Sequence, residues 1–341
     1  MRPFIYERVN TVADALHAGA LRESPPGSAA EATPEFLAGG TTLIDLMKLD
    51  VMRPARVVDI NALGRTAVGH ITESPNGLRL GALARMSDAA SHPVVRRNYP
   101  MVAQSLELAA SAQLRNMATL AGNVLQRTRC SYFRDVSYSN CNKRIPGSGC
   151  AALEGVNRQH AVLGTSGNCI ATYPGDFAQA LIALDAQVEL SSPEGAHLIP
   201  FASLHRAPGD TPHIETILSP GELITAFELP GGAWMRRSVY LKIRDRDSYE
   251  FALASAAVAL DLEHGAVRAA RIALGGVATV PWRAREAEAA LVGQPFDQAA
   301  AEAAADVAFG AAKVREHNAF KVALGKRTLV RALQQAAAME V

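Results

Sequence analysis

The sequence predicts an α+β protein built from more than one domain. The chain has 341 residues, which is too long for a single hydrophobic core of ordinary size. Two or three domains are therefore expected. Short apolar strand candidates alternate with helical segments in the first part of the chain, and turn-forming residues then gather at Pro230, Gly231 and Gly232. We therefore expect one domain over residues 1–229 and a smaller α+β domain over residues 235–341.

The first 60 residues predict an α/β unit. Asn10 and Thr11 are placed to cap the first helix, because short polar side chains accept hydrogen bonds from the first turn. Residues 21–35 are rich in Pro, Ser, Glu and Ala, which predicts a surface loop. Strands are expected at residues 4–6, 36–38 and 56–60, and helices at residues 12–16 and 43–48.

The rest of the chain alternates between helical and extended patterns. A strand is expected at residues 78–82, mainly helical structure at 85–123, an irregular segment at 124–170, a helix at 177–184 and a strand from 188. Asp176 stands where an N-cap of that helix is expected. Beyond residue 235 we expect strands at 239–243 and 267–274, a less regular strand over 252–260, and helices within 283–339.

Composition and charge exclude several classes of protein. A formal net charge of +1 gives no general field that would attract nucleic acid or an anionic membrane. No apolar run is long enough to cross a bilayer, and the first residues lack the basic and apolar regions of a signal peptide. We expect a chain that folds in the cytoplasm, or that is exported only together with another protein.

Two glycine-containing turns have the form of phosphate-binding loops. Glycines allow backbone N–H groups to approach phosphate oxygens, and a following helix adds positive potential at its N-terminus. Gly39 and Gly40 precede two threonines and a predicted helix, and Gly122 lies in a second turn of this kind. Each turn alone is also compatible with an ordinary structural turn. The chain has neither a Rossmann fingerprint after a strand nor a Walker A sequence.

All four cysteines lie in one segment, which indicates a metal site. Cys130, Cys141, Cys150 and Cys169 are separated by ten, eight and eighteen residues, without the close Cys-x-x-Cys pairs of most zinc sites. Widely spaced thiolates suit an iron–sulfur cluster, in which each ligand meets a different iron. Zinc and free thiols remain alternatives. Basic residues lie among the cysteines and are expected to offset the charge of a cluster: Arg127, Arg129, Arg134, Lys143 and Arg144.

Several motifs together resemble the FAD subunits of the xanthine oxidase family of molybdenum hydroxylases. The resemblance lies in residues 37–43, 113–123 and 174–177, and it continues through 221–224, 240–242 and 273–278. Nearly the whole chain is covered, with the motifs in the same order. One position departs from the pattern, because Ala121 stands where many relatives have glycine.

The cysteine segment is similar to that of the FAD subunits of bacterial periplasmic aldehyde oxidoreductases. This resemblance implies that an insertion at about residues 126–170 binds a 4Fe-4S cluster through Cys130, Cys141, Cys150 and Cys169. Most relatives lack the insertion, which favours a structural role for the cluster over a place on the electron path. Replacing a cysteine by serine is then expected mainly to reduce assembly.

The resemblance also implies a fold and a set of FAD contacts. The fold would be a two-subdomain FAD-binding domain like that of vanillyl-alcohol oxidase (PCMH type), with subdomains at about 1–60 and 61–229, followed by the smaller α+β domain. Asp176 would bond FAD, Ile224 would pack near it, and Lys242 would reach its flavin end. The other implied contacts are Phe36, Leu37, Ala38, Gly39, Gly40, Thr41, Thr42, Leu43, Gln113, Arg115, Thr119, Leu120, Ala121, Gly122 and Asn123.

Each of these residues also has an ordinary structural interpretation. Asp176 is then only a helix cap, Lys242 a solvated strand residue and Ile224 a core residue. Gln113 and Arg115 then only cap or bridge surface turns.

The function implied is that of an electron-transfer subunit. A large subunit with a molybdopterin cofactor would oxidise an aldehyde to a carboxylic acid. A small subunit with two 2Fe-2S clusters would carry the electrons to FAD on this chain. The three subunits would form a heterotrimer or a dimer of heterotrimers. No catalytic side chain is expected here, since the flavin carries the chemistry. Export to the periplasm with a twin-arginine partner is expected, with the cytoplasm as the alternative. The rival functions are a standalone FAD-dependent oxidase and a non-enzymatic metal-binding scaffold.

Overall fold

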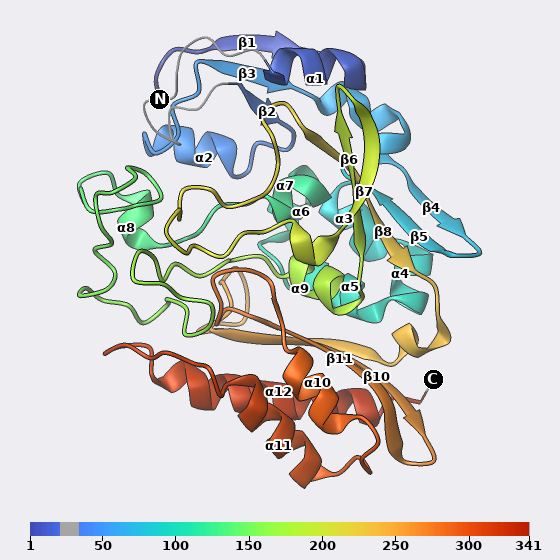
Figure 1. Cartoon of the computed structure of the whole chain (residues 1–341). Helices are drawn as coiled ribbons and strands as arrows, with labels where there is room; N and C mark the ends of the chain where they lie inside the picture. The colour runs from blue at the N-terminus through green and yellow to red at the C-terminus, as the bar shows by residue number, and fades with distance from the viewer. Residues whose placement is uncertain (21–33, 341) are drawn as a thin grey trace.

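The strands of the computed structural model, which describes residues 1–20 and 34–340, form three sheets (Figure 1). This confirms the predicted α+β class. The loop predicted over residues 21–35 falls mostly outside the described residues. Within the described ranges, none of the helices combines the length and apolar character that crossing a membrane requires.

A small parallel sheet opens the chain and confirms the predicted α/β unit. Its strand order is β1-β3-β2, with β1 (Ile5–Arg8), β3 (Arg56–Asp59) and β2 (Glu35–Leu37). The helices of this unit are α1 (Val12–Ala20) and α2 (Leu43–Lys48). Thr11 caps α1 as predicted, because its Oγ1 accepts a hydrogen bond of 3.1 Å from the backbone N–H of Asp14.

The second sheet is antiparallel and carries the largest hydrophobic core. Its order is β4-β5-β8-β6-β7, with β4 (Ile71–Ser74), β5 (Gly77–Gly81), β8 (Leu223–Pro230), β6 (Gln187–Ser192) and β7 (Gly195–Pro200). The helices that accompany it are α3 (Met86–Ser91), α4 (Pro93–Asn98), α5 (Pro100–Glu107), α6 (Ala112–Met117), α7 (Leu120–Val124) and α9 (Phe177–Ala183). Phe177 of α9 meets Phe227 of β8 edge to face, with ring centroids 5.8 Å apart.

The cysteine segment between α7 and α9 is irregular, as predicted. Its one described helix is the single turn α8 (Ser131–Arg134), and the remaining chain loops at the side of the molecule below α2 (Figure 1). Phe133 and Cys141 pack against Leu46 and Met47 of α2. The insertion is thus fixed to the first α/β unit by apolar contacts.

The third sheet and its helices form the C-terminal part of the chain. The sheet order is β12-β11-β10-β9, with β12 (Trp282–Arg283), β11 (Ala266–Gly275), β10 (Ala254–Glu263) and β9 (Ser238–Ile243). The helices α10 (Arg285–Leu291), α11 (Gln298–Ala308) and α12 (Phe320–Ala337) lie on one face of it (Figure 1). The domain limits at 229 and 235 stay a prediction, although β8 and β9 lie in different sheets.

Burial on both faces explains the weak alternation of β10. Residues 254–260 are all buried, because α12 packs on one side of the sheet while α5 and α9 pack on the other. A strand covered on both faces needs no polar side, so its sequence does not alternate. Small residues such as Ala256 and Ala257 allow both layers to approach closely.

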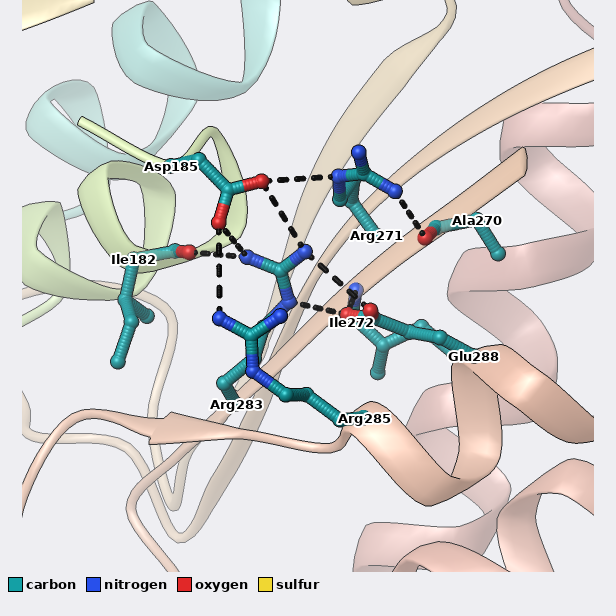
Figure 2. A network of polar contacts seen from close by, with 8 residues as sticks. All are labelled: Ile182, Asp185, Ala270, Arg271, Ile272, Arg283, Arg285 and Glu288. Atoms are coloured by element: carbon teal, nitrogen blue, oxygen red, sulfur yellow. Dashed lines mark hydrogen bonds and ion pairs between the residues drawn. The ribbon is translucent and has the colours of Figure 1, made fainter. Parts of the chain in front are cut away.

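An arginine cluster joins α9 to the third sheet (Figure 2). Asp185, just after α9, accepts bonds from Arg271 of β11 at 3.0 Å and from Arg283 of β12 at 2.9 Å, and Arg285 lies 3.8 Å away. Arg283 also donates to the backbone oxygen of Ile182 and bonds Glu288 of α10. Asp185 has a φ of +52°, a conformation that Asp and Asn tolerate better than most residues.

Asp185→Asn is expected to lower the free energy of unfolding by about 1 kcal/mol, because the carboxylate is half exposed and such networks are worth little per charge. Asparagine keeps the backbone conformation, so the change isolates the charge. Denaturant unfolding of the full chain measures it. Arg271→Ala and Asp185→Asn remove the same contact. The losses of unfolding free energy in the two single variants should therefore add up to more than the loss in the double variant. Strict additivity would contradict the interaction.

Candidate functional site

The first glycine turn predicted from the sequence touches the segment that leads into the second one. A Cβ on Gly39 would lie 2.1 Å from the carbonyl oxygen of Met117, so only glycine permits this approach. Gly40 has a φ of +74°, a second requirement for glycine in the same turn. Arg85 reinforces the junction, because its guanidinium donates to the same Met117 oxygen.

Two cavities of about 360 and 480 Å³ run along these turns. Both are lined by Thr41, Thr42 and Gly122, so they form one elongated groove, which we call the loop groove. The first cavity extends to Phe36, Glu35, His213, Leu223 and Ile224. The second extends to Asn123, Asp176, Arg246, Tyr249 and Phe251.

A buried polar atom of the loop groove has no hydrogen-bond partner among the described residues. Asn123 Oδ1 is buried and accepts no hydrogen bond. Thr42 stands at the N-cap of α2, yet its side chain makes no capping bond. Buried polar atoms are rarely left unsatisfied in native proteins, so the unpartnered Asn123 oxygen indicates a polar ligand in the groove.

Asp176 is held by two buried partners at the end of the second cavity. Its carboxylate accepts a bond of 2.6 Å from Tyr240 Oη and one of 2.8 Å from Lys242 Nζ. Lys242 Nζ also donates to the carbonyl of Leu108 at 3.1 Å. Burial, with the negative charge of Asp176 beside it, raises the pKa of Tyr240 well above its usual range, so the phenol stays protonated and donates.

The cysteines lie close together although their sequence positions are spread. Cys141 and Cys150 pair across a short antiparallel bridge, and the Cys169 thiol donates to the Cys150 sulfur. That bond, helped by nearby backbone N–H groups, lowers the pKa of Cys150 to about 6 against the effect of burial. Burial, reinforced by the negative charges of Cys141 and Cys150, raises the pKa of Cys130 to about 12. All four are free thiols.

Backbone N–H groups surround the cysteine sulfurs. Cys169 Sγ accepts from Ala171 at 3.4 Å, and His160 Nε2 lies 3.2 Å from Cys130 Sγ. The remaining amide donors to sulfur are Tyr132 and Phe133 for Cys130, and Ala152, Leu153 and Ile170 for Cys150. Within residues 1–20 and 34–340, no group of three or more His, Cys, Asp or Glu converges to hold a single metal ion.

The basic residues of the insertion bond carboxylates and backbone carbonyls. Arg129 and Arg134 bond Asp45 at 3.1 and 2.8 Å. Arg144 donates to backbone carbonyls, among them that of Phe133 at 2.9 Å. Arg127 and Lys143 bond Glu215. The hydrogen bonds to sulfur therefore come from amides and His160. The bond to Cys150 and burial raise the pKa of Cys169, and the positive charge of Lys143 opposes them, as the expected charge offset requires.

Comparison with known proteins identifies the family. Residues 2–232 match the family described as the FAD binding domain in molybdopterin dehydrogenase, and residues 239–336 match the CO dehydrogenase flavoprotein C-terminal domain. The chain belongs to the FAD-binding subunit family of molybdopterin dehydrogenases. The resemblance stated from the sequence is thereby confirmed.

Members of this family resemble the chain over most or all of its length. The aldehyde oxidoreductase FAD-binding subunit PaoB of Escherichia coli (strain K12) is 48% identical over 342 residues, which is 99% of each protein. The glyceraldehyde dehydrogenase medium chain of Sulfolobus acidocaldarius is 28% identical over 76% of this chain and 74% of its own. A chain of carbon monoxide dehydrogenase from Hydrogenophaga pseudoflava superposes with a TM-score of 0.75 at 26% identity, covering 99% of each chain.

The loop groove fits the FAD that this family binds. Gly39, Gly40 and Gly122 would provide the backbone cradle for a pyrophosphate, and Asn123 Oδ1 would offer an unused acceptor for a hydroxyl. Ala121 lies in α7, and the non-glycine positions of positive φ among the described residues do not include it. The alanine is therefore compatible with the turn geometry, and its departure from the family pattern requires no change in backbone.

Most of the residues predicted to contact FAD line the groove, and a few do not. Those that line it are Phe36, Ala38, Gly39, Gly40, Thr41, Thr42, Leu43, Thr119, Ala121, Gly122, Asn123, Asp176 and Ile224. Leu37 and Leu120 adjoin the lining residues without being among them. Gln113 and Arg115 lie on α6 outside it, and Arg115 bonds the carbonyl of Ala109 at 2.7 Å. Lys242 reaches the groove only through Asp176, whose side chain makes no capping bond to α9.

Sequence reasoning missed several groups at the site. Tyr240 was part of a recognised motif, but its bond to Asp176 had no signal in the sequence. Tyr249, with a φ of +54°, and Arg246 line the second cavity from the turn between β9 and β10. The histidines show no ligand spacing, so His160 was assigned no role. A sequence pattern can place Tyr240, Arg246 and Tyr249 on a strand or a turn, but it does not show which side chains or cavities they contact.

Glu215 joins the loop groove to the cysteine insertion. Its carboxylate bonds Arg127 Nε at 2.9 Å and Lys143 Nζ at 2.6 Å. Burial by itself raises the pKa of Glu215, but the charges of Arg127 and Lys143 outweigh that effect and bring the pKa down to about 2. This triad of Glu215, Arg127 and Lys143 connects residue 215 to the start and to the middle of the insertion.

This triad is expected to make stability depend on pH in acid. The carboxyl pKa is lower in the folded chain than its usual 4.5, so its contribution is complete above pH 4.5 and is lost as the pH falls toward 2. Glu215→Gln should therefore be much less stable than the unaltered chain at pH 6, with the difference shrinking between pH 4.5 and pH 2. Unfolding in denaturant at several pH values measures it. A difference that stays constant with pH would contradict the assignment.

Proposed function

We propose that the chain is the FAD-binding electron-transfer subunit of a molybdenum-dependent aldehyde oxidoreductase. The observation that carries the proposal is 48% identity, over 99% of both proteins, to the aldehyde oxidoreductase FAD-binding subunit of Escherichia coli. In the complex, an aldehyde and water give a carboxylic acid, two protons and two electrons. The electrons leave through this chain to an external acceptor.

In this proposal, the chain's own residues bind and orient the cofactor. Gly39, Gly40 and Thr42 hold the pyrophosphate with backbone and hydroxyl donors. Asp176, fixed by Tyr240 and Lys242, faces the flavin end of the groove. When bound, FAD supplies a centre that accepts two electrons and releases them to the acceptor.

The proposed partners are a large subunit with the molybdopterin cofactor and a small subunit with two 2Fe-2S clusters. The whole-length likeness to medium chains of carbon monoxide dehydrogenase supports such an assembly. We propose export to the periplasm together with a twin-arginine partner.

We further propose that the four cysteines hold a 4Fe-4S cluster. The donor set supports it: four thiols gathered in one region, with amide N–H groups directed at the sulfurs, suit a cluster whose thiolates each bind a different iron. A cluster here would crosslink the insertion to itself, which is a structural role.

The test is to purify the chain with its partner subunits without oxygen, and to record absorbance together with iron and sulfide content. Flavin bands with about four iron and four sulfide per chain, after subtracting the 2Fe-2S subunit, are expected. Flavin without that excess iron would leave the FAD function and remove the cluster. Absence of flavin would overturn the central proposal. Aldehyde oxidation by the isolated chain would favour a standalone oxidase instead.

A further inference from the structure

We propose that His160 is a positioning residue for the cysteine-bound cluster, donating its Nε2–H to the sulfur of Cys130. This inference rests on the proposed 4Fe-4S cluster. Nε2 lies 3.2 Å from Cys130 Sγ, within hydrogen-bonding range for sulfur. The ring is almost fully buried, and Nδ1 has no partner in the structure. The contact to sulfur is thus the only hydrogen bond of the ring among the described residues.

The surrounding chain fixes the ring in this orientation. The backbone N–H of His160 donates to the carbonyl of Asn157 at 2.9 Å, which closes a turn. Asn157 is itself buried and accepts the N–H of His317 at 3.0 Å. On the other side, the ring packs near Tyr132, with centroids 6.0 Å apart. The imidazole is therefore held in place by the turn from Asn157, by the contact of Asn157 with His317, and by the ring of Tyr132.

A buried ammonium lies beside the same turn. Lys321 of α12 is fully buried, and its Nζ donates to the carbonyls of Gln159 at 3.1 Å and Gly276 at 2.7 Å. Gln159 is the residue before His160. Through these bonds the C-terminal helix supports the turn that carries the imidazole, so the ring depends on contacts from two parts of the chain.

The expected effect concerns the reduction potential of the cluster. An N–H···S bond draws electron density from the thiolate, which favours the reduced and more negative cluster. Amide donors reach Cys130 as well, but among the described residues His160 provides the one side-chain N–H at its sulfur. Removing it should shift the equilibrium between oxidised and reduced cluster about tenfold toward the oxidised form, which for one electron is about 59 mV.

The experiment compares three variants of the complex purified with its partner subunits. His160→Phe removes the donor while keeping an aromatic ring, and His160→Gln keeps an N–H in reach of sulfur. The matched control is His205→Phe, because His205 is partly buried and also has a buried, unpartnered Nδ1, but it contacts the carbonyl of Val124 instead of a cysteine. Redox titration followed by the electron paramagnetic resonance signal of the 4Fe-4S cluster gives its potential, and iron analysis gives its retention.

A lower potential in His160→Phe, with His160→Gln and His205→Phe near the unaltered complex, is expected. An unchanged potential in His160→Phe with full iron content would overturn the inference. If His160→Phe loses iron, the result for His160→Gln decides. Full iron content and an unaltered potential in His160→Gln would support the donated hydrogen bond. Iron loss in both variants would show that His160 only packs against the site. A complex without any 4Fe-4S signal would instead overturn the proposed cluster, leaving FAD binding untouched.

Discussion

Gly39→Ala is expected to weaken FAD binding by about 10- to 100-fold. The added Cβ would lie 2.1 Å from the carbonyl oxygen of Met117, a backbone atom that moves only with the segment that leads into the second glycine turn. Overpacking of this kind costs about 1–3 kcal/mol, and each 1.4 kcal/mol is a factor of ten in affinity. The two turns would be pushed apart, so their donors would no longer match one pyrophosphate. Quenching of flavin fluorescence on titrating the flavin-free full chain measures the dissociation constant.

Gly310→Ala is the matched control for this change. A Cβ on Gly310 would meet its nearest atom, the carbonyl oxygen of Val307, at 3.4 Å, an ordinary contact. The position follows α11 and lies outside the loop groove. Its FAD affinity should match that of the unaltered chain. Equal affinity in Gly39→Ala would show that the contact between the turns does not position the pyrophosphate donors.

Asp176→Ala is expected to cost about 3–5 kcal/mol in the free energy of unfolding. Lys242 and Asp176 form an ion pair in which the side chains are 1% and 5% exposed, and breaking one partner of such a pair leaves the other charge buried without compensation. Tyr240 would lose its acceptor as well. The pair joins the start of α9 to β9, so the loss would also loosen the third sheet against the groove. Denaturant unfolding of the full chain without flavin measures it.

Asp261→Ala provides the comparison, because its partner Arg268 lies on the exposed part of β11. Exposed pairs gain little over solvated charges, so this variant should unfold close to the unaltered chain. Asp176→Ala combined with Lys242→Met should recover part of the loss, since the unpaired ammonium is then removed. A double variant less stable than Asp176→Ala would contradict the argument that the buried charge is the cause.

Local sequence determined many, but not all, of the elements of the fold. Thr11, Gly40 and the turn at Gly231 carry their information within a few residues, since capping, positive φ and chain reversal depend on neighbours. Residues 71–74 and 195–200 were not predicted as strands. They are edge strands of the second sheet with mostly exposed side chains, so they show little of the apolar pattern that marks a strand.

By itself, then, the sequence determined the α+β class, the glycine turns, the gathering of cysteines and, through its motifs, the family. Only the tertiary structure decided what these parts face. In the fold Gly39 contacts Met117, and Lys242 forms an ion pair with Asp176. His160 lies against Cys130, whereas Arg129 of the insertion bonds Asp45. Partners tens of residues apart leave no pattern in one sequence, because their meeting depends on how whole sheets and loops pack.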